Sequence, residues 1–434
     1  MMVASHYVVR EGYKMTKIGE LPLEWKIVKI ADMADDSIEN SFVDGDWIEA
    51  EYITNEGIRV IQTGNIGIGR FIDKSSKKYI SKESFNELNC KKIYPGDILI
   101  CRMADPTGRS CIIPELNYEM VTAVDCTIFR VNKNKFSSVY INYYLNSGYN
   151  LKNTQQYEQG TTRKRITRTN LGKLSIPIPP LEEQQKIAEI LSTVDEQIEN
   201  TEQLIEKTKE LKKGLMQQLL KKGIAHKEFK QTEFGEIPVS WEVKSIDDIA
   251  PVKTGGTPSK SRIEYWQNGT IPWMTSGEVN LKRVTDVKER ITELGYNNSN
   301  TSIFPCGTVM MALNGQGKTR GTVAILEIET TCNQSLAGIL PTEEYDSGYL
   351  FYYLENSYEK LRGLTGEGRS GLNLGLIKNF NIALPKIDEQ QKIASILSSV
   401  DEQIECYEQE KEKYLALKKG LMQQLLTGKI RVTV

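Results

Sequence analysis

The sequence has few of the residues that carry most enzymatic and metal chemistry. Its 434 residues include 2 histidines, His6 and His226, and 7 scattered cysteines with no Cys-x-x-Cys pair. Zinc sites need Cys and His ligands at short, regular spacings, so no such site can be assembled from this sequence. Acid–base and nucleophilic triads lack material for the same reason. We therefore expect no metal site and no catalytic residues, and we expect reduced, mostly buried thiols.

The sequence also lacks long apolar runs and a large excess of charge of one sign. No stretch approaches the roughly 20 apolar residues of a membrane span, and residues 1–15 contain no run that could serve as a signal peptide. The expected location is the cytoplasm. A formal net charge of −2 argues against a polybasic protein that holds DNA tightly by itself. Local basic patches can still bind phosphate.

Motifs for nucleotide binding and methyl transfer are absent as well. Gly315-Gln-Gly-Lys-Thr319 is similar to the end of a phosphate-binding loop, but Ala312 stands where that loop needs its first glycine. The residues that follow, 320–325, read as a strand where the loop requires a helix. No Asn/Asp-Pro-Pro-aromatic motif occurs, so an amino-methyltransferase site is not evident.

The sequence does contain a long internal repeat. Residues 182–220 align with residues 388–426, and 29 of these 39 positions are identical. A shorter repeat, Gly-Glu-x-Pro-x-x-Trp, lies at 19–25 and again at 235–241. The two halves diverge between these markers. The order along the chain is therefore variable domain, shared segment, variable domain, shared segment.

The shared segments read as long helices, because apolar residues recur at alternating steps of four and three, the heptad pattern of a coiled coil. About 40 residues would form a rod of roughly 60 Å. We expect the two rods to pack antiparallel, since a parallel pair would need a connection as long as the rod. The predicted helix–helix seam consists of Ile187, Leu191, Val194, Ile198, Ile205, Ile393, Leu397, Val400, Ile404 and Tyr407.

The variable domains are predicted to be α+β, with mixed strands and helices. Short apolar runs bounded by turn residues predict strands at 97–101, 126–131, 308–312 and 322–326. Two further segments read as helices, at 138–146 and 349–356. The strand order cannot be predicted from these patterns.

Loops rich in Gly, Thr, Ser, Arg and Lys recur in both variable domains, at 160–165, 253–260, 315–320 and 366–371. Their backbone N–H groups and hydroxyls could grip phosphate, while Arg and Gln could read base edges. A single loop of this kind is more often a solvated turn, so the repetition carries the hypothesis. The candidate DNA contacts are Thr63, Asn65, Arg102, Arg109, Thr162, Arg163, Lys164, Arg165, Lys253, Thr254, Thr257, Ser259, Lys260, Ser276, Gln316, Lys318, Thr319, Arg320, Arg369 and Ser370.

Taken together, these features resemble the specificity subunits of type I restriction–modification enzymes. The markers are the two Gly-Glu-x-Pro-x-x-Trp sites, Lys-Thr-Gly-Gly-Thr-Pro at 253–258, and Pro-x-x-x-Glu-Gln-Gln-Lys-Ile-Ala at 179–188 and 385–394. The resemblance implies two target recognition domains related by an approximate internal two-fold repeat. The expected segments are an N-terminal extension (1–12), recognition domain one (13–180), spacer helix one (181–223), recognition domain two (224–386) and spacer helix two (387–430).

The resemblance also implies a function and a set of partners. Each recognition domain would read one half of a split target in double-stranded DNA, and the helices would set the gap and dock two modification subunits. Because the two variable domains differ in sequence, we expect an asymmetric target with unlike halves. Those partners would bind S-adenosylmethionine and methylate adenine, and restriction subunits would use ATP and Mg²⁺. This chain would bind no cofactor and would not itself be an enzyme.

Two other classes of protein fit the sequence less well. A coiled-coil protein–protein adaptor with two ligand-binding lobes would account for the repeat but not for the Gly/Thr/Arg loops. Specific DNA binding separates that adaptor from a DNA reader. A fused methyltransferase would require S-adenosylmethionine binding by this chain alone.

Overall fold

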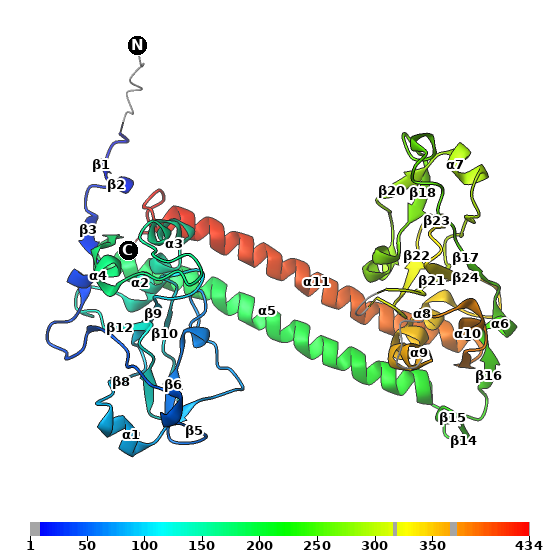
Figure 1. The fold of residues 1–434 in the computed structure, drawn as a ribbon, viewed down its shortest axis with the longest axis horizontal. Coiled ribbons are helices and arrows are strands. Elements are labelled where there is room, and N and C mark those ends of the chain that lie inside the picture. Colours follow the sequence, from blue (N-terminus) through cyan, green and yellow to red (C-terminus); the bar gives the residue numbers. More distant parts are fainter. Residues whose placement is uncertain (1–8, 316–318, 365–370, 434) are drawn as a thin grey trace, which may run out of the picture. The chain divides into compact units, whose positions relative to one another are not determined.

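The computed structural model describes residues 9–315, 319–364 and 371–433. The chain divides into two compact units (Figure 1). The first unit consists of Met1–Asn200 and Glu410–Val434, and the second of Thr201–Gln409. Each unit therefore contains one of the two variable domains and a part of both long helices.

The first unit is built around two sheets. The antiparallel sheet has the order β10-β9-β12-β4, and the mixed sheet has the order β5-β7-β6-β11-β8, in which β6 and β11 run parallel. The strands are β4 (Phe42–Asp44), β5 (Ile53–Thr54), β6 (Ile58–Ile61), β7 (Tyr79–Ile80), β8 (Lys92–Ile93), β9 (Ile98–Cys101), β10 (Ser110–Ile112), β11 (Met120–Thr122) and β12 (Cys126–Phe129).

Strand β9 shows how the sequence fills the interior of this unit. Successive strand residues point to opposite faces of a sheet. Ile98 and Ile100 join the core that includes the first long helix, while Leu99 and Cys101 join a second core. All four residues are buried, which explains why this strand reads as a continuous apolar run rather than an alternating one.

Short helices complete the first unit, and each begins at a Ser or Thr whose side chain accepts a backbone hydrogen bond. Such N-caps satisfy one of the unpaired N–H groups of the first turn. The helices are α1 (Lys82–Glu87), α2 (Ser138–Leu145), α3 (Gly148–Gln155) and α4 (Arg168–Lys173), with a 3-10 turn, η3, at Thr63–Asn65. Helix α2 is almost wholly buried between the antiparallel sheet and the long helix.

The second unit has a related but not identical architecture. Its larger sheet has the order β17-β24-β21-β22-β19, and a smaller sheet has the order β20-β18-β23. The strands are β17 (Val252–Thr254), β18 (Ile271–Met274), β19 (Arg283–Val284), β20 (Glu289–Ile291), β21 (Val309–Ala312), β22 (Val323–Leu326), β23 (Thr331–Cys332) and β24 (Leu336–Ile339). The helices are α6 (Ile246–Ile249), η5 (Ser276–Leu281), α7 (Glu293–Asn297), α8 (Ser347–Asn356), α9 (Tyr358–Gly363) and α10 (Leu374–Lys378).

Each unit also carries the same two small strand pairs. A hairpin contains the Gly-Glu-x-Pro motif, and its glycine has a positive φ, +109° at Gly19 and +88° at Gly235, which disfavours any other residue. The hairpins are β1 (Tyr13–Thr16) with β2 (Gly19–Pro22), and β14 (Phe229–Thr232) with β15 (Gly235–Pro238). The second pairs are β3 (Lys26–Lys29) with β13 (Ser175–Ile178), and β16 (Glu242–Ser245) with β25 (Asn381–Leu384).

The two long helices are α5 (Leu181–Lys222) and α11 (Ile387–Leu425). In the second unit Lys209 pairs with Glu408 at 2.9 Å and Lys212 with Asp401 at 2.8 Å, so numbers rise along α5 as they fall along α11. The segments are therefore antiparallel, as predicted. Of the ten predicted seam residues nine are buried, and Tyr407 is half-buried.

The predicted mixed fold is confirmed at the level of individual elements. The four predicted strands correspond to β9, β12, β21 and β22, and the two predicted helices to α2 and α8. Among the described residues, no helix combines the length and apolarity needed to cross a membrane.

Candidate DNA interface

The repeated sequence motifs meet around one buried glutamate in the first unit. Trp25, from the Gly-Glu-x-Pro-x-x-Trp motif, donates through Nε1 to Glu183 Oε2 at 3.1 Å. Glu183 belongs to the Glu-Gln-Gln-Lys-Ile-Ala motif, and Arg431 pairs with the same carboxylate at 2.6 Å. The next residue, Gln184, accepts from the backbone N–H of Ser137, which precedes α2. The motifs thus fasten the domain to the start of α5. We call this arrangement of Trp25, Glu183, Gln184 and Arg431 the clasp.

The second unit repeats the clasp with one change. Trp241 Nε1 donates to Glu389 Oε2 at 3.1 Å, as in the first unit. His226 takes the role of the arginine, at 2.8 Å from Glu389 Oε1. Gln390 accepts from the backbone N–H of Asp346, which precedes α8. The Gly-Glu-x-Pro-x-x-Trp and Glu-Gln-Gln-Lys-Ile-Ala motifs therefore hold the structure together, and neither contains a candidate DNA contact.

A second repeated contact joins each recognition domain to both long helices. In the first unit Tyr143 of α2 donates its hydroxyl to Asp195 of α5 at 2.7 Å. Lys418 of α11 pairs with the same carboxylate at 2.5 Å and lies 5.5 Å from the Tyr143 ring centre. Burial raises the pKa of Tyr143, so its hydroxyl stays a donor. We call Tyr143, Asp195 and Lys418 the first joint.

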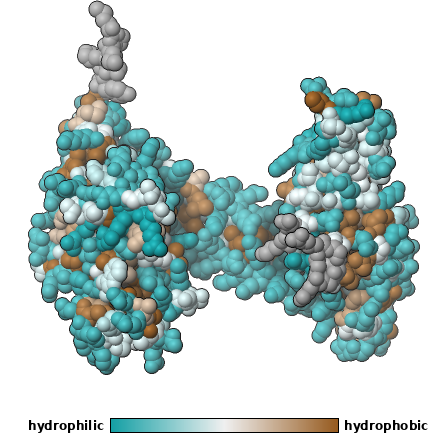
Figure 2. Space-filling model, in the orientation of Figure 1, coloured by the Kyte–Doolittle hydropathy of each residue, from teal (hydrophilic) through white to brown (hydrophobic). Residues whose placement is uncertain are grey.

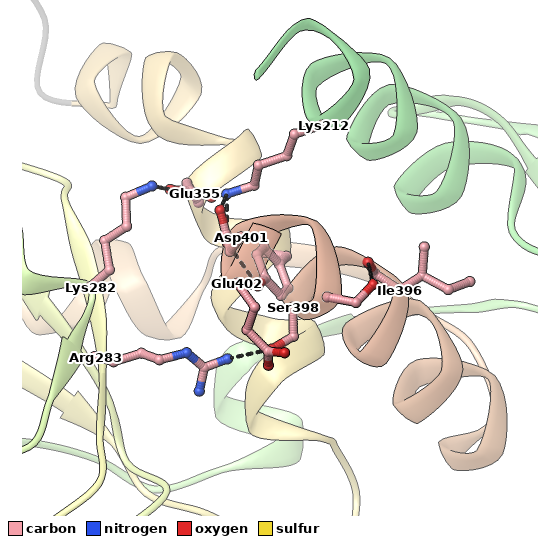
Figure 3. Close-up of polar contacts among 10 residues, drawn as sticks. Lys212, Lys282, Arg283, Glu355, Ile396, Ser398, Asp401 and Glu402 are labelled. Atoms are coloured by element: carbon pink, nitrogen blue, oxygen red, sulfur yellow. Dashed lines mark hydrogen bonds and ion pairs between the residues drawn. The ribbon is translucent and has the colours of Figure 1, made fainter. Parts of the chain in front are cut away.

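The second joint consists of Tyr352, Asp401 and Lys212, and Figure 3 shows its surroundings. Tyr352 of α8 donates to Asp401 Oδ2 at 2.9 Å, and Lys212 of α5 pairs with Asp401 at 2.8 Å. Here Lys212 also pairs with Glu355 of α8 at 3.0 Å, and Glu355 pairs with Lys282 at 2.8 Å. The second joint is thus larger than the first and better shielded from solvent.

This network extends to the segment that follows η5. Arg283 donates to Ser398 of α11 at 3.1 Å (Figure 3). It also pairs with Glu327 at 3.1 Å. Lys282 and Arg283 directly follow η5, whose first residue is the candidate contact Ser276. The turn η5, which carries the candidate contact Ser276, is therefore linked to α8 through Lys282 and to α11 through Arg283.

Two predicted DNA contacts of the first unit, Arg102 and Arg109, form hydrogen bonds within the folded domain. Arg102 is 3% exposed, lies 3.0 Å from Asp44 and donates to backbone carbonyls. Burial lowers its pKa. Arg109 is 9% exposed and donates four hydrogen bonds, all to backbone carbonyls of neighbouring loops. A DNA contact by either side chain would have to break these bonds, so both arginines primarily shape the loops.

The predicted contacts at 162–165 lie in an exposed turn. Its ends are closed by paired backbone hydrogen bonds of 2.8 and 2.9 Å, and it lies beside the segment after β9. Lys164 pairs with Glu158 at 3.3 Å and Arg165 with Asp125 at 3.2 Å, and both cations remain about half exposed. The carboxylates are less exposed than the cations, at 7% for Glu158 and 18% for Asp125, so the two cations both present charge at the surface and hold largely buried carboxylates.

Thr63 and Asn65 form η3, which begins directly after β6. Asn65 is 7% exposed and closes a capping box with Gln62, so its side chain orders the turn. Thr63 lines a cleft of about 290 Å³. Three lysines in the loop before β7 line the same cleft, and sequence reasoning missed them: Lys74, Lys77 and Lys78. The signal was present as the short Lys-Ser-Ser-Lys-Lys run at 74–78.

In the second unit, the loop at 253–260 is shaped by close packing. A Cβ atom added at Gly255 would collide with the backbone of Cys332. The Thr254 and Thr257 hydroxyls both donate to the segment at Gln334. The Lys-Thr-Gly-Gly-Thr-Pro motif therefore reflects a tight turn against β23, in addition to any contact it makes with DNA.

The exposed end of that loop carries cationic and hydroxyl groups. Lys260 lies 4.0 Å from the ring centre of Trp266 and pairs with Glu289 at 2.6 Å. The Ser259 hydroxyl bonds to that of Ser261, and Lys253 is exposed on β17. On the face drawn in Figure 2, hydrophilic and hydrophobic residues lie side by side in the second unit.

Several candidates lie at or beyond the limits of what the structure describes. Thr319 and Arg320 are half-buried. Gln316, Lys318, Arg369 and Ser370 lie outside the described residues. In the described parts of the chain, no group of three or more Cys, His, Asp or Glu is placed to hold a metal ion.

A family profile matches this chain twice, once in each half. The profile of the type I restriction modification DNA specificity domain matches residues 22–210 and 238–414. The type I restriction enzyme MjaVIII specificity subunit of Methanocaldococcus jannaschii is 27% identical over 459 residues, covering 100% of this chain and 99% of the relative. The specificity subunit of the Escherichia coli EcoR124I/EcoR124II enzymes is 27% identical over 65% of this chain and 66% of its own length.

Solved structures show the same fold at low sequence identity. The S subunit of the type I restriction–modification system from M. genitalium superposes with a TM-score of 0.59 at 17% identity. The superposition covers 92% of this chain and 96% of that subunit. A chain from a structural study of complex assembly in a type I system has the same TM-score at 15% identity, with 94% and 99% covered.

Proposed function

Because the chain belongs to the family of type I restriction–modification DNA specificity subunits, we propose that its two target recognition domains read unlike halves of one split DNA target. The observation that carries this proposal is the contrast between the two units. Their clasps and joints are built from matching residues, and seven strands pair in the same order in both units, whereas the sequences of the variable segments and their edge strands β5, β8 and β19 differ. Two different variable segments, attached to the long helices by the same contacts, suit a protein that reads two different half-sites.

The pair of long helices holds the two recognition domains and, we propose, acts as the spacer between the half-sites. Each joint fastens a recognition domain to α5 and α11 together, so the helix pair would fix the separation of the half-sites. The same helices would dock two modification subunits, which bind S-adenosylmethionine, and restriction subunits would supply ATP- and Mg²⁺-dependent cleavage. This chain would bind no cofactor, would contribute recognition without catalysis, and would work in the cytoplasm beside the host DNA.

The adaptor alternative is not favoured, because the family match covers both recognition domains and not the helices alone. The test is to map adenine methylation across the host genome with and without this gene. Loss of one split, asymmetric motif on deletion, and its return on complementation, is expected. A palindromic motif would contradict the two unlike halves. If the methylome stays unchanged although the modification subunit is expressed, the proposed function is wrong.

A further inference from the structure

The cleft beside η3 is a concentrated cationic site in the first unit. It has a volume of about 290 Å³ and lies between the end of β6 and the loop that leads into β7. The residues that matter for its chemistry are Arg59, Gln62, Thr63, Lys74, Lys77 and Lys78. The loop is held in place where the backbone N–H of Val60 donates to the carbonyl of Lys78 at 2.9 Å.

The charges in this cleft do not cancel. Four cations line it, and the carboxylate in contact with them is Asp73, which pairs with Arg59 at 2.5 Å and Lys77 at 3.3 Å. The hydrogen bond from Arg59 lowers the pKa of Asp73, which therefore stays ionised. Lys74 and Lys78 form no ion pair within the described chain. Lys74 Nζ lies directly over Gly64, where a Cβ atom would collide with it.

The Arg59 guanidinium lines the cleft and is held in place by its hydrogen bonds. The side chain is 1% exposed and donates to the Tyr118 hydroxyl and to Asp73. Its Nε–H has no acceptor among the described residues. Buried N–H groups without a partner are rare in folded proteins, and they often mark a place where a ligand or an ordered water completes the bonding.

At the matching turn of the second unit, a carboxylate replaces the amide of the first. After β18, Glu278 occupies the position that Asn65 holds after β6. The Glu278 carboxylate is 6% exposed and accepts from the backbone N–H groups of Thr275 at 2.7 Å and Lys288 at 2.8 Å. A carboxylate at this point repels an anion, so the repeated fold does not by itself require a cationic cleft here.

We infer that the cleft of the first unit binds a phosphodiester group of the DNA backbone through Lys74 and Lys78, with Thr63 as a neighbouring hydroxyl donor. This inference rests on the proposed function and assigns it a sequence-independent anchor. Phosphate contacts fix the position and register of a protein on the duplex without reading bases. Such an anchor would hold the first recognition domain on DNA although the whole chain carries a formal charge of −2.

The test measures how DNA affinity depends on salt. The specificity subunit is assembled with its modification subunits and bound to a duplex of about 40 base pairs, roughly four helical turns. The duplex contains the split motif that methylation mapping identifies. A second duplex has its first half-site scrambled. Wild type is compared with K74A/K78A, with the charge-preserving K74R/K78R, and with K26A/K29A, which removes two exposed lysines from β3.

We expect K74A/K78A to weaken binding to both duplexes by the same factor. The slope of log K against log salt should become shallower by about 0.9 for each DNA phosphate that the variant no longer neutralises. K74R/K78R and K26A/K29A should keep the wild-type slope. An unchanged slope in K74A/K78A would overturn the inference, and so would a selective loss of preference for the intact first half-site. Should the wild-type complex show no preference between the duplexes, the proposed function fails, while the slopes still report on the cleft.

Discussion

Asp401→Asn is the substitution that most directly tests the role of the joints. Asp401 receives the Tyr352 hydroxyl from the recognition domain and the Lys212 ammonium from α5. Asparagine has nearly the same shape but no charge, so the change removes the ion pair and leaves packing intact. The matched control is Asp195→Asn in the first joint, where the carboxylate and its partner Lys418 are more exposed.

The expected magnitude follows from burial. Lys212 is 10% and Asp401 21% exposed, whereas Lys418 is 22% and Asp195 39% exposed. Removing one partner of a fully buried pair costs about 3–5 kcal/mol, but Lys212 keeps Glu355, so we expect about 2 kcal/mol at the second joint. The first joint is close to an exposed pair, for which about 1 kcal/mol or less is typical.

Hydrogen exchange read by mass spectrometry can resolve the two joints in one chain, where a single melting curve of a two-unit protein cannot. Asp401→Asn should speed exchange of α8 roughly 30-fold and leave α2 unchanged, since about 2 kcal/mol corresponds to that factor. Asp195→Asn should speed exchange of α2 by a factor of about 5 or less. Equal effects at both joints, or no change in α8, would refute the reasoning from burial.

Three further predictions concern the helices, the clasp and the thiols. Inserting one heptad in each long helix, after Glu202 and after Glu412, should lengthen the spacer of the methylated motif by about three base pairs, because seven residues add roughly 10 Å at about 3.4 Å per base pair. A changed half-site in that methylome would contradict the division of labour. Trp241→Phe should lower the free energy of unfolding by about 1–2 kcal/mol, because Glu389 loses a buried donor, and Trp241→Ala by about 3–5 kcal/mol. Thermal unfolding checks the order, and a Trp241→Phe variant as stable as the wild type would contradict a stabilising bond to Glu389. At about pH 8 a maleimide should label Cys306 and Cys406, which are exposed, far faster than buried thiols such as Cys90, whose pKa burial raises to about 11. Equally fast labelling of a third cysteine before denaturation would refute that assignment.

Local patterns were sufficient to predict much of the fold. The heptad steps predicted both long helices, and the apolar runs at 97–101 and 308–312 predicted β9 and β21. Strand order was out of reach, because pairings such as the parallel contact between β6 and β11 join segments far apart in the chain. Nothing local in a strand sequence selects a distant partner.

The candidate site was harder to predict than the fold. Arg102 and Arg109 occur in a polar stretch typical of a contact loop, but packing turned both toward backbone carbonyls. Lys212 occurs in a solvated-looking run of α5, yet it is buried because two carboxylates surround it. Exposure of a charged side chain depends on tertiary neighbours, which a single sequence does not reveal.

A graft between the two units tests the central claim most sharply. The variable segments are bounded alike: the N–H of Ile30 donates to the Leu174 carbonyl at 2.9 Å, and that of Ile246 to the Phe380 carbonyl at 3.1 Å. Residues 30–174 can therefore replace residues 246–380 at matched junctions, and Tyr143 would then bring the joint tyrosine to Asp401.

The decisive measurement is the adenine methylome of a host that carries this graft in place of the wild-type gene. If each recognition domain reads its own half-site, the first half of the motif is retained and the second half becomes its copy on the opposite strand, so that the methylated motif is an inverted repeat. A graft that still directs methylation to the original two unlike halves would contradict the account.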